Sequence, residues 1–195
     1  MMNPLDLISS VLGLTCVFLA GRGSKYNFWV GYLYTAALFL LFREKNLAAS
    51  MMLQPISLVI NILGHYRWTH PKADEESSEK VGELKVSMLS WTGRCIAVLS
   101  FAAVAVLWGM ALNHLFPADP HPYLDTCVTA LILLAQLLGA LKKWECWIVW
   151  LVVNVTQLIL HLSVGNVFMP CVSALYLING IISLINWFKL YRRKA

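Results

Sequence analysis

The densest pattern of polar and aromatic residues lies in the apolar stretch 146–163. On an α-helix, offsets of 0, 3, 7, 10 and 14 place five side chains on one stripe: Trp147, Trp150, Asn154, Gln157 and His161. Polar groups within a membrane are costly unless they face protein or a water-filled cavity, so the stripe should point inward. Indole faces attract cations, and carboxamides offer both donors and acceptors. The stripe therefore predicts a binding site for a polar ligand.

Other apolar stretches carry polar residues at the same helical spacing and could face this stripe. The stretch 168–188 has four, and the stretches 47–66 and 124–141 each have a pair seven residues apart: Tyr176, Asn179, Ser183 and Asn186; Gln54 and Asn61; Thr129 and Gln136. Four inward-facing helices would then each present an amide, which suits a neutral polar group such as an amide, a base or sugar hydroxyls. The candidate ligand-binding residues are Trp147, Trp150, Asn154, Gln136, Tyr176, Asn179, Asn61, Gln157 and His161.

A purely structural interpretation of the same side chains stays open. Amides within a membrane also hydrogen-bond helices to one another, so the stripes could hold a bundle together without binding a ligand. His161 is the one titratable side chain near the centre of a stretch, and it could equally be a structural hydrogen-bonding residue.

The residue types missing from the apolar stretches exclude several classes of protein. No Asp, Glu or Lys occurs in the middle of a stretch, because Asp6, Asp125 and Glu145 all lie near ends. Ion-coupled carriers generally need an intramembrane ionisable group or an ion site, and a hydrolase needs a nucleophile with a base or a metal. The five cysteines form no CxxC pair. We therefore expect no enzymatic activity, no catalytic residues, no cofactor and no metal site.

Seven apolar stretches must position these residues, at roughly 4–20, 26–42, 47–66, 93–115, 124–141, 146–163 and 168–188. About 20 apolar residues suffice for a helix to cross a membrane. A hydrophobic content of 59% with 13% charged residues excludes an ordinary soluble domain. We predict an all-α integral membrane protein with seven transmembrane helices. The net charge of +5 comes from basic residues at helix ends, which indicates contact with a lipid bilayer rather than with nucleic acid.

The basic residues also predict an orientation. With seven spans, 13 of the 15 Lys and Arg residues fall on one side of the membrane, and only Arg43 and Lys45 fall on the other. Because cytoplasmic loops carry the excess of basic residues, the N-terminus should lie outside and the C-terminus in the cytoplasm.

A polar segment at 69–90 divides the stretches into three, one and three. An intervening single span gives the second set of three the same orientation as the first, which is one known plan of transporter repeats. An Asn followed by a Trp ends each set: Asn61 with Trp68, and Asn179 with Trp187. We predict a first three-helix repeat at 1–68, a solvated cytoplasmic linker at 69–92, a linker helix at 93–116, and a second repeat with a basic tail at 117–195.

Several strings resemble the PnuC family of bacterial vitamin transporters. The strings are Trp147 to Asn154, with its WxxW signature; Ala135-Gln136 with Gly139; Tyr176 to Gly180; Asn27 to Gly31; and Asn61 to Trp68. The resemblance covers nearly the whole chain. It implies a SWEET-like fold of two three-helix bundles joined by a fourth helix, a homotrimer, and a place in the bacterial inner membrane.

The resemblance also implies a function. The family imports nicotinamide riboside by facilitated diffusion, and a cytoplasmic kinase traps the vitamin as its phosphate, while other branches import thiamine or riboflavin. Trp147, Trp150 and Tyr176 could hold a cationic pyridinium without a carboxylate, and Gln136 with the two asparagines 154 and 179 could bind carboxamide and ribose groups. The alternative of a different class is a membrane scaffold or sensor that transports nothing.

Overall fold

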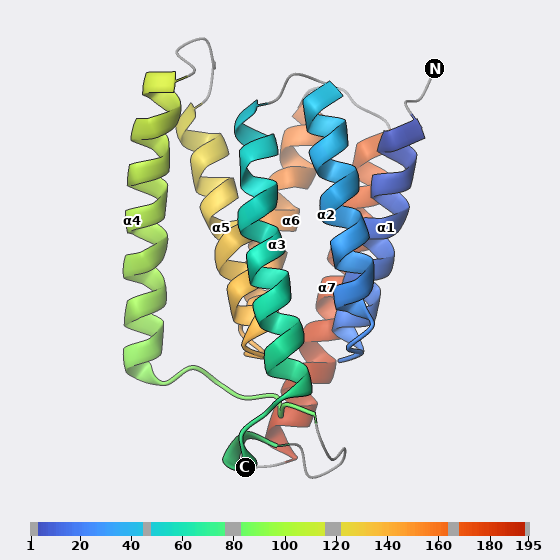
Figure 1. Ribbon diagram of the computed structural model, residues 1–195, viewed down its shortest axis with the longest axis vertical. Coiled ribbons are helices and arrows are strands. Elements are labelled where there is room, and N and C mark those ends of the chain that lie inside the picture. Colours follow the sequence, from blue (N-terminus) through green and yellow to red (C-terminus); the bar gives the residue numbers. More distant parts are fainter. Residues whose placement is uncertain (1–3, 45–47, 77–82, 116–121, 164–167, 194–195) are drawn as a thin grey trace.

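Long α-helices account for nearly all of the chain that the structure describes. The computed structural model describes residues 4–44, 48–76, 83–115, 122–163 and 168–193. Within these ranges it has seven α-helices and one 3₁₀ turn (Figure 1): α1 (Pro4–Gly21), α2 (Asn27–Glu44), α3 (Ala48–Thr69), η1 (Ala73–Glu75), α4 (Trp91–Leu115), α5 (Pro122–Ala140), α6 (Cys146–Ser163) and α7 (Phe168–Arg192). By length and composition alone, α1, Trp91–Ala111 of α4 and Cys171–Arg192 of α7 are able to cross a membrane. The prediction of an all-α, seven-helix chain is confirmed.

Six of the described helices form a closed ring, and α4 stands outside it (Figure 1). Each ring helix packs on two neighbours, in the order α1, α2, α3, α5, α6, α7 and back to α1. Helix α4 packs on α5 alone among the described pairs with substantial contact. We call α1–α3 the N-terminal triplet and α5–α7 the C-terminal triplet. The triplets therefore meet at two junctions, α3 with α5 and α7 with α1, and any cavity inside the ring lies between them.

Helices α1 and α5 end in the same way, at the end of the ring where the C-terminus lies. Gly23 follows α1 and Lys142 follows α5, and both have a positive φ, of 69° and 53°. In each turn this residue donates its N–H to a carbonyl three residues back, and the next residue donates to a carbonyl five residues back. This pair of bonds is the Schellman motif that commonly ends helices. The basic residues after α1, α3, α5 and α7 gather here, so we call it the basic end.

The prediction of a solvated linker is wrong at two positions within residues 83–89. Leu84 and Val86 are only 3% and 7% exposed, and they pack into the same apolar cluster as Trp68 of α3. The preceding part of the linker is tied to α3 by a hydrogen bond from Arg67 Nη2 to Glu75 Oε1 of 3.0 Å, which lowers the pKa of this carboxyl. The burial was missed because the linker was judged by its overall polarity. Leu84 and Val86 alternate with polar residues, which is the pattern of a half-buried strand.

Candidate functional site

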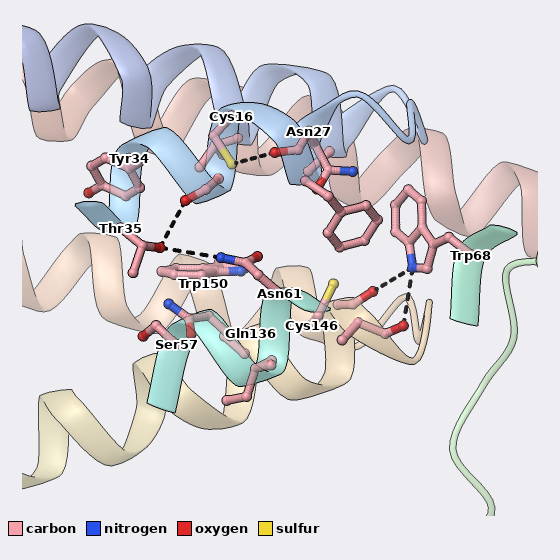
Figure 2. Close-up of a pocket in the computed structure, with 18 of the residues that line it drawn as sticks. Cys16, Asn27, Tyr34, Thr35, Ser57, Asn61, Trp68, Gln136, Cys146 and Trp150 are labelled. Atoms are coloured by element: carbon pink, nitrogen blue, oxygen red, sulfur yellow. Dashed lines mark hydrogen bonds between the residues drawn. The ribbon is translucent and has the colours of Figure 1, made fainter. Parts of the chain in front are cut away.

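A pocket lies inside the ring, between the two triplets (Figure 2), with a cavity volume of about 130 Å³. At about 30 Å³ per water in the liquid, this cavity has room for roughly four water molecules. Its lining comes from every ring helix and runs from the middle of the ring to the basic end. The described lining residues include no Asp, Glu, Lys or Arg. The site is therefore a chamber of amides, hydroxyls and aromatic rings, without formal charge.

The N-terminal triplet supplies a polar wall. Asn61 of α3 donates from Nδ2 to Thr35 Oγ1 of α2 at 3.4 Å, and Thr35 in turn donates to the Gly31 carbonyl at 2.8 Å (Figure 2). A Cβ on Gly31 would lie 3.3 Å from the Asn61 amide, so the missing side chain lets α2 and α3 approach closely enough for this pair. Ser57, one helical turn before Asn61, lines the same wall. The wall offers hydroxyl and amide groups to a ligand.

The C-terminal triplet borders the pocket with two polar atoms that lack partners. Gln136 Oε1 of α5 and Trp147 Nε1 of α6 are buried, and neither has a hydrogen-bond partner among the described residues. Buried polar atoms are nearly always hydrogen-bonded, and an unpaired one costs about 1–3 kcal/mol. Because both residues line the pocket, they are candidate hydrogen-bonding partners for a ligand there.

An aromatic cluster closes the pocket at the basic end. Phe28 packs edge-on against Trp68 with ring centroids 5.0 Å apart, and Trp147 packs edge-on against Trp187 at 5.6 Å. Trp68 and Trp187 meet in the middle at 5.8 Å. Each half of this cluster pairs a ring at the start of the middle helix of a triplet with a ring near the end of its last helix. The same geometry thus occurs twice, once in each triplet.

The two central tryptophans also bond across the junctions. Trp68 of the N-terminal triplet donates from Nε1 to the Ala140 and Gly139 carbonyls at the end of α5, at 3.1 and 3.2 Å. Trp187 of the C-terminal triplet donates to the Gly21 carbonyl at the end of α1, at 3.1 Å. Each indole therefore donates to carbonyls at a helix end in the opposite triplet. These bonds hold the basic end together.

Four of the nine candidate residues line the pocket: Asn61, Gln136, Trp147 and Trp150. Figure 2 shows Asn61, Gln136 and Trp150 around the same space, together with Thr35 and Ser57. Trp147 is only 2% exposed and belongs mainly to the aromatic cluster, whereas Trp150 is partly exposed to the pocket.

The other candidates lie off the pocket lining. Tyr176 approaches α1, because its hydroxyl would lie 2.3 Å from a Cβ on Gly13, and it hydrogen-bonds Tyr34. Asn179 Nδ2 would lie 3.8 Å from a Cβ on Gly21, so it faces the junction of α7 with α1. Asn154 stands against Gly180 between α6 and α7 by the same measure, at 3.8 Å.

Two candidates on α6 and several overlooked residues complete the account. Gln157 is not part of the lining, and the side chain of His161 lies outside the described residues. The sequence reasoning missed Tyr34, Thr35 and Ser57 as lining residues. A signal for Ser57 existed, because it stands on the stripe of Gln54 and Asn61 at offsets of 0, 3 and 7. A signal for Tyr34 also existed, because it stands seven residues after Asn27, which lines the pocket too.

Comparison with known proteins decides the family. The family model described as nicotinamide mononucleotide transporter matches residues 3–189, which is nearly the whole chain. The chain belongs to this family. It is a multi-pass membrane protein and a vitamin transporter of the PnuC type, not an enzyme.

Two relatives and one solved structure show how similar the chain is to characterised members. It is 26% identical over 179 residues to the nicotinamide riboside transporter PnuC of Escherichia coli (strain K12), covering 83% of this chain and 75% of the relative. It is 25% identical over 174 residues to the riboflavin/roseoflavin transporter RibM of Streptomyces davaonensis, covering 88% and 78%. The crystal structure of the vitamin B3 transporter PnuC matches with a TM-score of 0.78 and 25% identity, over 98% of this chain and 83% of that one. The predicted resemblance to PnuC is confirmed.

Proposed function

We propose that this chain imports nicotinamide riboside across the bacterial inner membrane by facilitated diffusion. The observation that carries the proposal is the uncharged chamber between the triplets, with an unpaired acceptor on Gln136 beside the Trp150 ring. Its relative in Escherichia coli is a nicotinamide riboside transporter, which supports the same substrate.

The chemistry of the chamber suits a nucleoside with a cationic ring. An indole face holds a cation for roughly 0.5–2 kcal/mol, so Trp150 could bind the pyridinium without a carboxylate that would make release slow. Gln136 Oε1 would accept a hydrogen bond from the carboxamide NH2 group. The ribose hydroxyls would pair with Asn61, Thr35 and Ser57 on the polar wall. Trp147 would contribute its free Nε1–H at the edge of the chamber.

The remaining candidates keep a place in the proposal as residues that support the chamber. Tyr176 reaches it through Tyr34, which lines the pocket, and Asn154 and Asn179 stand at the α6–α7 and α7–α1 junctions. The roles of Gln157 and His161 rest on the helical stripe alone.

Import requires an orientation, a driving force and an assembly. We propose that the N-terminus lies outside and the C-terminus in the cytoplasm, because the basic end carries the excess of Lys and Arg. A cytoplasmic kinase that phosphorylates the vitamin would keep its free concentration low and drive net entry. Residues 1–68 and 117–195 would be the two repeats that move against each other, with 69–92 and the helix of 93–116 between them. The chain would assemble as a homotrimer.

Riboflavin is a second candidate substrate, because RibM is about as similar to this chain as PnuC of Escherichia coli is. The neutral flavin would gain nothing from a cation–aromatic contact, and the uncharged chamber would not exclude it. Thiamine, whose ring is cationic, satisfies the same argument as nicotinamide riboside. A scaffold or sensor without transport would need no unpaired polar atoms beside a cavity.

Uptake into proteoliposomes without ion gradients tests the proposal. Labelled nicotinamide riboside, thiamine and riboflavin are compared at equal concentration, with protein-free liposomes as the control. Saturable entry of nicotinamide riboside, inhibited by its own unlabelled form and weakly by the other two, is the expected result. Saturable entry of riboflavin or thiamine alone would reassign the substrate, and entry of none would favour the scaffold or sensor.

A further inference from the structure

The linker crosses the basic end of the ring directly beneath the aromatic cluster. Leu84 and Val86 belong to the same buried cluster as Phe28, Trp68 and Trp187, which line the pocket. Residues 83–89 therefore form a second layer over the aromatic floor of the chamber. A ligand that leaves through the basic end would meet the aromatic rings first and this segment next.

The segment is attached to both triplets. On the N-terminal side, Leu84 donates its N–H to the Trp68 carbonyl at 3.3 Å. On the C-terminal side, Ser87 donates to the Lys142 carbonyl at 3.1 Å and accepts from the Trp144 N–H at 3.1 Å. Leu89 donates to Glu145 Oε1 at 2.9 Å. The segment therefore bridges the gap that must widen if the triplets separate at this end.

The two attachments differ in the contacts that make them. Residues 87–89 make three hydrogen bonds to the α5–α6 turn, and the chain then continues into α4, which packs on α5. Lys143 Nζ adds a bond to Ser87 Oγ at 2.8 Å. On the other side, Leu84 donates to the Trp68 carbonyl, and Lys85 donates to the carbonyl of Glu75, in the chain that follows α3. The side chains of Leu84 and Val86 lie in a cluster with members from both triplets. We expect separation of the triplets to leave 87–89 on the α5–α6 turn and to disturb the packing of Leu84 and Val86.

We propose that residues 83–89 are a latch over the cytoplasmic exit of the chamber. Anchored on the C-terminal triplet, the latch closes the basic end by inserting Leu84 and Val86 into the aromatic cluster, and it opens by releasing them. The inference rests on the proposed function for the direction of exit. The latch itself is defined by packing alone, so it can be tested without any vitamin.

Cys146 is a native reporter of the latch. Its side chain is 1% exposed, lines the pocket and belongs to the cluster that Leu84 and Val86 cover. A membrane-impermeant maleimide is added to inside-out or right-side-out membrane vesicles that contain the full-length chain. Modification of Cys146 is followed by peptide mass spectrometry, which separates it from the other cysteines. No change of the remaining thiols is needed.

The test variant is Leu84→Ala with Val86→Ala, and the matched control is Met88→Ala, a residue 40% exposed in the same segment. Truncation of buried aliphatic side chains typically destabilises the packed state enough to shift the equilibrium between closed and open latch by at least roughly ten-fold. We expect Cys146 to react at least about ten-fold faster in the test variant, only when the reagent is on the face that carries the C-terminus. Met88→Ala and the conservative Leu84→Met should react as the parent does.

Three outcomes would overturn the latch. Equal Cys146 reactivity in the parent and in the folded double variant would show that Leu84 and Val86 do not close the exit. Faster reaction from both faces of the membrane would show that the bundle is generally loosened. The proposal would then stand only if the milder Leu84→Ala variant reacts faster from the face of the C-terminus alone. Faster reaction of Cys146 in Met88→Ala would show that the burial of Leu84 and Val86 is not what closes the exit. A chain that takes up no vitamin would refute the proposed function but leave these labelling results intact.

Discussion

Trp147 and Trp150 stand one turn apart on α6, and the structure gives them different tasks. Trp147 is buried in the aromatic cluster against Trp187, whereas Trp150 is partly exposed to the chamber. We predict that Trp150→Ala lowers the affinity for nicotinamide riboside while the protein remains folded. We predict that Trp147→Ala mainly lowers the stability of the bundle.

The magnitudes follow from burial and contact. Truncating a buried aromatic residue typically costs about 3–5 kcal/mol, which is the expected loss in unfolding free energy for Trp147→Ala. An indole stacked on a cation contributes roughly 1–2 kcal/mol, which corresponds to an affinity loss of about five- to thirty-fold for Trp150→Ala. Trp150→Phe keeps a smaller aromatic face and should lose less.

Isothermal titration calorimetry in detergent measures the affinity, and thermal unfolding measures the stability of the same samples. Val152→Ala is the matched control, because this residue is 49% exposed on the outer side of the same helix. A folded Trp150→Ala variant that binds nicotinamide riboside as tightly as the parent would refute the stacking argument. A stable Trp147→Ala variant that fails to bind would show that Trp147 acts mainly in binding and not in packing.

Two further predictions concern the junctions and the driving force. A Cβ on Gly21 would lie 1.9 Å from the buried Ser183 Oγ, so Gly21→Ala should lower the unfolding temperature, with a loss of about 1–3 kcal/mol. Adding Ser183→Gly should restore most of the lost stability. The junction of α3 with α5 already places a glycine, Gly64, against an alanine, Ala140. Absence of rescue would mean that the two junctions are not equivalent. Uptake into proteoliposomes should persist after proton and sodium gradients are dissipated, because the described chamber lining has no Asp, Glu, Lys, Arg or His. Collapse with an uncoupler, with the sensitivity lost in His161→Ala, would contradict uniport.

The helices could be predicted from the sequence because hydrophobic length and loop charge depend on local composition. The stretches proposed at 26–42 and 146–163 correspond closely to α2 (Asn27–Glu44) and α6 (Cys146–Ser163). Trp68 and Trp187 were visible in the sequence as corresponding residues of a repeated motif. Their reciprocal bonds to the ends of α5 and α1 were not, because a bond across the ring depends on which helices become neighbours.

The site could be predicted only in part, for a geometric reason. Each ring helix has one face toward lipid, two toward neighbouring helices and one toward the chamber. A polar stripe shows only which residues avoid lipid. It therefore selected Gln136 and Asn179 alike, although Gln136 lines the chamber and Asn179 faces a helix junction. Thr35 of α2 was not selected because a single hydroxyl four residues after a glycine, here Gly31, is common in any helix. Hydrophobicity of the linker, averaged over its length, likewise hid Leu84.

A structure of the protein with nicotinamide riboside bound tests the central claim most directly. The account predicts density for the vitamin inside the ring, with its pyridinium ring beside Trp150 and its carboxamide within hydrogen-bond distance of Gln136. Density for the vitamin outside the ring, for example between α4 and α5, would contradict the account. A vitamin inside the ring but out of contact with both residues would keep the chamber and refute the way it is proposed to bind.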